Sequence, residues 1–141
     1  MKDLIIRKAQ NSDIESVFKM RNLFATSFEP DYINFKKSYE NLIKSEDALL
    51  LLIEINKLLI GYALGFDHFT LFANGRVSWI EEIYIIENQR RKGFASNLIS
   101  EFEIWGKSRK SRLIAMATRR AKEFYLNLGY EESALYFRKV L

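Results

Sequence analysis

The stretch IYIIENQRRKGFASNLI, residues 83–99, joins an apolar run to three basic residues, one glycine and a helical pattern. The apolar run reads as the end of a central strand, because both of its faces are apolar. A helix that begins after the loop offers unpaired backbone N–H groups and the positive end of its dipole. Arg90, Arg91 and Lys92 add positive charge, and Gly93 removes a side chain that would block close approach. The stretch therefore predicts a turn that binds a pyrophosphate group.

The glycine spacing separates this turn from two common phosphate-binding loops. A P-loop requires a second glycine and a Lys–Ser/Thr pair, and a dinucleotide fingerprint requires three glycines. The segment RRKGFA instead fits the pattern R/Q-x-x-G-x-G/A, with Arg90, Gly93 and Ala95 at the fixed positions. Taken alone, the basic triplet is equally well explained as a solvated surface after a strand.

The sequence on either side predicts a mixed α/β domain. Apolar periodicity and turn signals give the order β-α-α-β-β-β-α-β-α-β, typical of one central sheet with helices on both faces. We expect a single domain over residues 1–141. The expected strands cover residues 3–9, 48–55, 58–66, 75–86, 112–117 and 133–141. The expected helices cover residues 11–24, 31–45, 95–107 and 119–130.

Composition excludes several kinds of chemistry. The 141 residues contain no cysteine, which excludes disulfides, thiolate metal sites and a cysteine nucleophile. His68 is the single histidine, which argues against a histidine metal site or a serine–histidine triad, so no metal is expected. No apolar run approaches the roughly 20 residues of a membrane span, and the N-terminal residues do not resemble a signal peptide. We therefore expect a cytoplasmic protein without membrane contact, whose net charge of +4 suits an anionic small ligand or weak nucleic-acid contact.

Three segments together resemble the GNAT superfamily of N-acetyltransferases. RRKGFA resembles its acetyl-coenzyme A signature, EEIYI its preceding strand, and AKEFYLNLGY its A-x-x-x-Y-x-x-x-G-F segment. The resemblance implies a mostly antiparallel sheet with a splayed pair of central strands. It also implies that acetyl-coenzyme A is the co-substrate, and that a primary amine attacks the thioester directly while both substrates are bound.

The resemblance also implies where the cofactor binds. The pantetheine arm is expected along the main chain of Ile83, Tyr84 and Ile85, with an amide near Ile85 polarising the thioester carbonyl. The pyrophosphate is expected on seven consecutive amides, those of Arg90, Arg91, Lys92, Gly93, Phe94, Ala95 and Ser96. The side chains of Arg91 and Lys92 either reach outer phosphates or are simply solvated. Thr118 stands where many relatives carry a cofactor-binding asparagine, so a contact there is not expected.

Three side chains are candidates for acid–base chemistry. An amine is mostly protonated at neutral pH and needs a proton acceptor. Glu81 and Glu82 lie in an apolar strand, where glutamate is uncommon. Strand alternation predicts opposite faces for them, and Glu81, which would share the face of Ile83 and Ile85, is the preferred base; pairing with an arginine is the alternative. By resemblance Tyr125 protonates the departing thiolate and contacts the cofactor, although it also fits as a core aromatic.

The sequence says less about the amine acceptor and the oligomeric state. An amine site is expected between the early helices and residues 65–75, where Asp67, His68, Phe69 and Phe72 could line it or pack as core. A non-catalytic coenzyme A-binding regulator is one rival reading, and a homodimer through the last strand is compatible with the pattern. A less favoured rival is nucleic-acid binding by a basic stretch that contains Lys107, Arg109, Lys110, Arg112, Arg119, Arg120 and Lys122.

Overall fold

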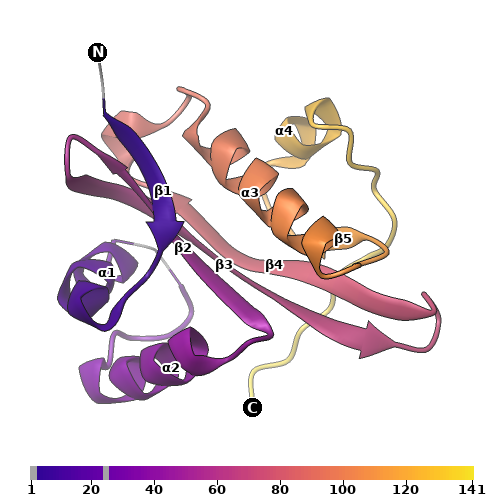
Figure 1. The fold of residues 1–141 in the computed structure, drawn as a ribbon, viewed down its shortest axis with the longest axis horizontal. Helices are drawn as coiled ribbons and strands as arrows, with labels where there is room; N and C mark the ends of the chain where they lie inside the picture. Colours follow the sequence, from indigo (N-terminus) through magenta and orange to yellow (C-terminus); the bar gives the residue numbers. More distant parts are fainter. Residues whose placement is uncertain (1–2, 24–25) are drawn as a thin grey trace.

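A computed structural model describes residues 3–23 and 26–141, and it confirms the mixed α/β architecture. Five strands form one sheet in the order β1-β2-β3-β4-β5, with α1 and α2 on one face and α3 on the other (Figure 1). The strands are β1 (Leu4–Lys8), β2 (Ala48–Ile55), β3 (Leu58–Thr70), β4 (Gly75–Ile85) and β5 (Ile114–Met116). The helices are α1 (Ile14–Arg21), α2 (Tyr32–Lys44), α3 (Phe94–Ser108) and α4 (Lys122–Asn127), with short 3₁₀ turns at Asn11–Asp13 and Glu87–Gln89.

The first four strands pair antiparallel, and β5 alone runs parallel to its neighbour β4. The turn between β2 and β3 contains no glycine, yet Asn56 and Lys57 both adopt left-handed conformations, with φ of 51° and 68°. Two successive positive φ values are what a two-residue turn needs to match the twist of its strands. The strands expected over residues 48–55 and 58–66 therefore form an antiparallel hairpin across this two-residue turn.

Alternation along β2 builds two apolar layers. Leu49, Leu51 and Ile53 pack toward α3, whereas Leu50 and Leu52 pack toward α1 and α2. All five are buried. A strand that is apolar on both faces is expected where helices cover both sides of a sheet. The sheet is therefore packed on both faces, and this packing fixes the position of β4.

A β-bulge interrupts β4. Leu64 of β3 pairs with Glu82, but the next β3 residue, Gly65, pairs with Ile80. Glu81 is therefore an extra residue with no pairing partner on β3. A bulge of this kind shifts the alternation of side chains by one position. Ile80 consequently packs in the α3 layer with Ile83 and Ile85. Strict alternation along the strand predicts that Ile80 lies on the face opposite Ile83 and Ile85, and this prediction is wrong because of the bulge.

Two predicted elements differ from the structure at the ends of the chain. Residues 131–141 form no strand, so the predicted final strand over 133–141 is wrong for the single chain. This segment instead leaves α4 on the α3 side of the sheet and ends on the α2 side (Figure 1). The helix α1 ends at Arg21, and the predicted end of that helix at residue 24 lies outside the described residues.

None of the helices within residues 3–23 and 26–141 combines the length and apolarity that crossing a membrane requires.

Most of the segment predicted to line the acceptor site belongs to the sheet, and residues 71–74 form the turn between β3 and β4. Asp67 and His68 belong to β3, and the Asp67 side chain is fully buried. Its carboxylate accepts hydrogen bonds from Arg76 Nη1, at 2.7 Å, and from Arg109. Proximity to Asp67 raises the pKa of Arg109. The assignment of Asp67 to an amine pocket is therefore corrected, because two arginines already neutralise it.

We expect the Asp67→Asn substitution to lower the free energy of unfolding by about 2 kcal/mol, since two arginines then lose their buried counter-charge. Asp47→Asn is the matched control, because Asp47 contacts the same two arginines with a side chain that is 60% exposed. Its expected cost is below about 0.5 kcal/mol. Urea denaturation of both variants measures the difference, and equal costs would contradict the structural role of Asp67.

Candidate functional site

The turn before α3 leaves a row of backbone amides without partners. Gly93 precedes the helix with φ of 86°, and no side chain caps the helix start. Within the described residues, no acceptor bonds to the amides from Arg91 to Ser96. An added Cβ at Gly93 would meet nothing within 4 Å, so the positive φ, and not crowding within the protein, favours glycine there. The amides from Arg91 to Ser96 therefore remain open to an acceptor such as an anion.

One amide of the predicted set is already used. The Arg90 amide donates to the Glu87 carbonyl at 3.3 Å, which removes it from the predicted row. Lys92 reaches back to Gln89 through a 3.2 Å hydrogen bond, and Arg91 holds a φ of 63°, which is uncommon for a side chain of this size. The predicted anion site is thereby shortened to residues 91–96.

The side chain of Arg90 fastens this turn to β4. Its Nε donates to the Ile85 carbonyl at 2.8 Å, and its guanidinium lies 5.2 Å from the centre of the Tyr84 ring. Both contacts join the loop to the strand that carries the candidate site. Arg90 is therefore a positioning residue in this structure and does not point its charge at the amides.

The Arg90→Ala substitution is expected to lower the free energy of unfolding by about 1–2 kcal/mol, because a charge-assisted hydrogen bond and a cation–π contact are lost. Arg91→Ala serves as the control, since the Arg91 side chain is exposed and makes no hydrogen bond, ion pair or ring contact within the described residues. Thermal and urea unfolding measure both. An Arg90→Ala protein as stable as the Arg91→Ala protein would show that the loop is held by other contacts.

The strands β4 and β5 separate next to this turn. Their ladder covers only three residue pairs, from Ser78–Ile114 to Ile80–Met116, whereas β4 continues to Ile85 against β3. The geometry agrees with the expected splay of two central strands. An extended ligand could therefore lie along the edge of β4 beyond Ile80, where β5 no longer pairs with it.

Tyr125 is buried on the α3 side of this opening. Its ring packs edge-on against Phe124 and Tyr130 and shares a core cluster with Ile85 and Leu98. Burial raises the pKa of the Tyr125 hydroxyl. The Tyr125 hydroxyl makes no hydrogen bond within the described residues. Every fully buried side-chain oxygen there does have a partner, so the Tyr125 oxygen is not fully buried and retains access to solvent. A protonated phenol thus faces open space at the edge of the core.

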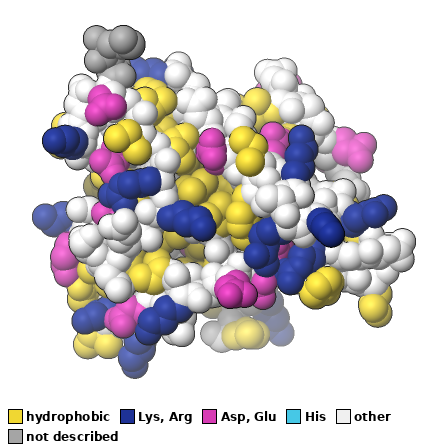
Figure 2. Space-filling view, in the orientation of Figure 1, with side chains coloured by type: hydrophobic (Ala, Val, Ile, Leu, Met, Phe, Trp, Pro, Cys, Tyr) yellow, Lys and Arg dark blue, Asp and Glu magenta, His cyan; other side chains and the backbone are white. Residues whose placement is uncertain are grey.

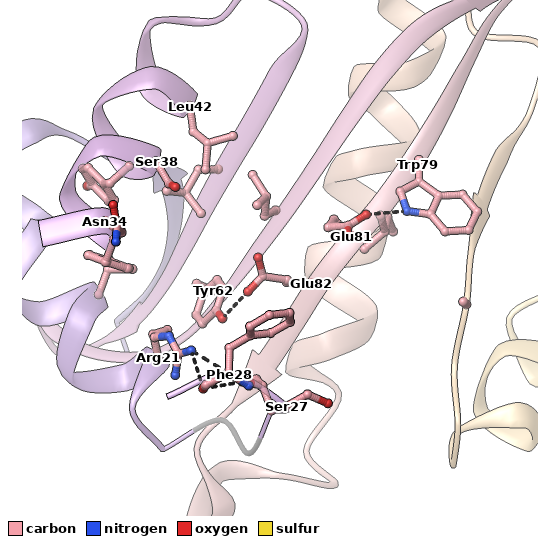
Figure 3. A pocket seen from close by; sticks show the side chains of 18 of the residues that line it. Arg21, Ser27, Phe28, Asn34, Ser38, Leu42, Tyr62, Trp79, Glu81 and Glu82 are labelled. Atoms are coloured by element: carbon pink, nitrogen blue, oxygen red, sulfur yellow. Dashed lines mark hydrogen bonds between the residues drawn. The ribbon is translucent and has the colours of Figure 1, made fainter. Parts of the chain in front are cut away.

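A cavity of about 1090 Å³ lies on the opposite face of β4, and both predicted glutamates line it (Figure 3). Glu82 accepts a 2.9 Å hydrogen bond from the buried Tyr62 hydroxyl, and Glu81 accepts one of 2.7 Å from Trp79 Nε1. Burial and the nearby Glu82 raise the pKa of Tyr62. The bulge explains why consecutive glutamates border one cavity, which corrects the prediction that they lie on opposite faces and that Glu81 shares the face of Ile83.

The cavity walls come from parts of the chain that the sequence patterns did not single out. Arg21 of α1 donates to the Phe28 carbonyl at 3.2 Å, and Arg138 donates to Ser27 at 2.7 Å. Tyr136 also lines the cavity, whereas Asp67, His68, Phe69 and Phe72 do not. Phe69 and Phe72 are exposed near the β3–β4 turn. The contact between Arg138 and Ser27 joins residues 111 positions apart, so no local sequence signal marks it.

Thr118 uses its hydroxyl locally. The Thr118 Oγ1 accepts a 3.0 Å hydrogen bond from the Ala121 amide just before α4, while the residue borders the cavity.

Part of the basic stretch is engaged in ion pairs within the protein, because Arg109 bonds Asp67 and Asp47. On the face shown in Figure 2, basic and acidic side chains are interspersed around a central apolar area. This distribution does not form the continuous basic surface that nucleic-acid binding favours.

Comparisons with known proteins agree with this geometry. A family model described as "Acetyltransferase (GNAT) family" matches residues 14–130. An uncharacterized N-acetyltransferase of Bacillus subtilis, YhfO, is 20% identical over 90% of this chain and 89% of its own length. The aminoglycoside N-acetyltransferase AAC(6′)-Iy in complex with coenzyme A superposes with a TM-score of 0.85 at 19% identity, covering 99% of this chain and 96% of that one. A transcriptional regulator from Bacillus halodurans gives a TM-score of 0.89 at 18% identity, covering 99% and 100%.

Proposed function

Because the chain belongs to the acetyltransferase (GNAT) family, we propose that it transfers an acetyl group from acetyl-coenzyme A to a primary amine held in the cavity beside Glu81 and Glu82. The observation that carries this proposal is the row of unpartnered amides before α3, next to the point where β4 and β5 separate. Amides at a helix start bind phosphate groups, and an exposed strand edge accepts an extended amide-containing arm.

The cofactor fits the residues that are present. The amides from Arg91 to Ser96 would hold the pyrophosphate, and the main chain from Ile83 to Ile85 would hold the pantetheine arm, with an amide near Ile85 acting on the thioester oxygen. Acetyl-coenzyme A supplies the activated acetyl group. The glutamates and Tyr125 border β4 from opposite faces, so proton acceptance from the amine and proton donation to the thiolate take place on opposite sides of the strand.

The direct route is favoured by the side chains available. An acyl-enzyme needs an activated nucleophile, and the sequence holds no cysteine and one histidine, His68, which does not line the cavity. The amine would therefore attack while both substrates are bound. Either glutamate can accept the proton, directly or through one water molecule.

The test is a screen of primary amines with release of the coenzyme A thiol as the readout, combined with calorimetric titration of coenzyme A. Acetyl transfer to at least one amine, with steady-state kinetics that indicate a ternary complex of protein and both substrates, supports the proposal. Tight coenzyme A binding without thiol release across amino acids, polyamines, aminoglycosides and peptides would favour the regulator instead. Failure to bind coenzyme A would overturn the cofactor assignment.

The two glutamates are separated by substitution. If Glu81 is the proton acceptor, Glu81→Gln is expected to lower kcat by about 10²-fold at neutral pH, with coenzyme A affinity unchanged. If Glu82 is the acceptor, the same effect is expected of Glu82→Gln. Glu101→Gln, an exposed position on α3, is the control. If both variants keep more than half of the wild-type kcat, neither carboxylate is the base.

A further inference from the structure

The cavity beside β4 is lined by charges of both signs that do not pair with one another. Three arginines and four carboxylates line it. Within residues 3–23 and 26–141, none of these side chains forms an ion pair with another. Both signs of charge therefore remain available to a ligand, and their positions indicate what kind of acceptor fits.

The negative charge of interest lies on β4. Glu82 accepts its hydrogen bond from the Tyr62 hydroxyl through one carboxylate oxygen, and Glu81 accepts from Trp79 Nε1 in the same way. Both donors are neutral, and the second oxygen of each carboxylate makes no hydrogen bond within the described residues. A carboxylate oxygen without a partner can accept a hydrogen bond from an amine or ammonium group. The amine end of the acceptor is therefore expected here.

The positive charge lies at the segment that follows α1. Arg21 donates to the Phe28 carbonyl at 3.2 Å, and Arg138 donates to the neighbouring Ser27 hydroxyl at 2.7 Å (Figure 3 shows the first contact). Neutral oxygens thus hold both guanidinium groups at the same two residues. Guanidinium groups bind carboxylates and phosphates with two parallel hydrogen bonds. An anionic group of the ligand fits at this place.

The nearby carboxylates leave these arginines unneutralised. Asp31 is engaged in capping α2, where it accepts hydrogen bonds from the backbone amide and the side-chain amide of Asn34. Glu29 forms no ion pair within the part of the chain that the structure describes. The guanidinium charge at this wall is therefore free to act on a ligand.

The Tyr62 hydroxyl lies near both kinds of charge. Burial raises the pKa of this hydroxyl, the charge of Glu82 raises the pKa further, and the charge of Arg21 lowers it. A charged group shifts a pKa in this way from a short distance. In Figure 3 the three side chains lie on the same part of the cavity wall. One small molecule can therefore reach Glu82 and Arg21 together.

We propose that the acceptor is a small primary amine that also carries an anionic group, either a carboxylate or a phosphate. Its amine lies at Glu81 and Glu82, and its anionic group binds Arg21 and Arg138. The inference rests on the proposed acetyl transfer and narrows its acceptor. A polyamine carries positive charge only, so it would place a further cation beside the two arginines, where like charges repel.

Calorimetric titration of matched amines into the protein with excess coenzyme A tests this inference apart from catalysis. The pairs are β-alanine with β-alaninamide, phenylalanine with phenylalaninamide, and phosphoethanolamine with ethanolamine, so that carboxylate and phosphate are tested separately. We expect the anionic member of at least one pair to bind about tenfold more tightly or better. Equal affinity within every pair overturns the inference, even if neutral amines are acetylated. Tighter binding of an anionic member without thiol release would instead support the anion site and contradict acetyl transfer.

Two substitutions test the arginines. Arg21→Gln and Arg138→Gln each remove a positive charge but keep an N–H donor for the loop oxygens. Each is expected to lower the preference for the anionic member about tenfold and to leave the affinity for the neutral member unchanged, whereas Arg21→Lys keeps most of the preference. Arg112→Gln is the control, because Arg112 is exposed and does not line the cavity. Equal loss of affinity for both members of a pair would assign the arginines a structural role only and overturn the anion site.

Discussion

The Tyr125→Phe enzyme is expected to lose about 10³-fold in kcat while it binds coenzyme A as tightly as the wild type. The substitution removes only the hydroxyl, and positioned proton donors contribute about 10²–10⁴-fold to rates. The Tyr125 hydroxyl makes no hydrogen bond within the described residues, so its loss should leave the free energy of unfolding almost unchanged. Pre-steady-state thiol release and calorimetric binding of coenzyme A measure the two effects separately.

The pH dependence follows from the burial of this side chain. Burial raises the pKa of Tyr125 above the ordinary value of 10, so the protonated, donating form dominates throughout the neutral range. Any loss of donation by the wild-type enzyme therefore begins only above about pH 10. A fall in kcat between pH 7 and pH 9 that Tyr125→Phe abolishes would contradict a proton donor with a raised pKa.

Tyr130→Phe is the matched control for this prediction. Tyr130 packs against Tyr125 and its pKa is also raised by burial, but its hydroxyl donates to Glu103 at 2.8 Å. Loss of that hydrogen bond is expected to cost about 1 kcal/mol of stability with little change in kcat. Equal loss of kcat in both variants would indicate a packing effect on the shared core.

Local sequence signals explain why the turn before α3, to which we assign the cofactor, could be predicted. Gly93 and the helical pattern after it lie within one short stretch, and the proposed anion site consists of the backbone amides of that stretch itself. The α3 contacts of Leu98 and Phe102 follow from helical periodicity in the same way. Each of these features depends on residues fewer than about ten positions apart.

The cavity proposed to hold the acceptor could not be predicted, because it depends on contacts between residues far apart in sequence. One extra residue at Glu81 turns the side chains of β4, and a bulge leaves no period in the sequence to mark it. Tyr62 meets Glu82 across 20 positions, and Arg138 meets Ser27 across 111. The final segment has strand-forming residues but no strand partner in a single chain, so its propensity alone was misleading.

The substitution Ser96→Glu is expected to separate protein stability from cofactor binding. Ser96 is the third residue of α3, where a carboxylate interacts favourably with the helix dipole, so the free energy of unfolding should rise by about 0.3–1 kcal/mol. The same carboxylate would stand beside the amides proposed to hold a diphosphate. At about 5 Å and an effective dielectric constant of about 20, one pair of like charges costs roughly 3 kcal/mol, which weakens coenzyme A binding by about 10²-fold.

Ser100→Glu places the same charge one turn further along α3, at an exposed position on the same side of the helix. Its carboxylate lies beyond the first turn, so both the gain in stability and the loss of affinity should be small. Urea denaturation and calorimetric titration with coenzyme A measure both variants. Opposite changes in stability and affinity, confined to Ser96→Glu, are specific to an anion bound at the helix start, because a variant that merely damaged the fold would lose both. Equal coenzyme A affinity in the two variants would place the diphosphate elsewhere.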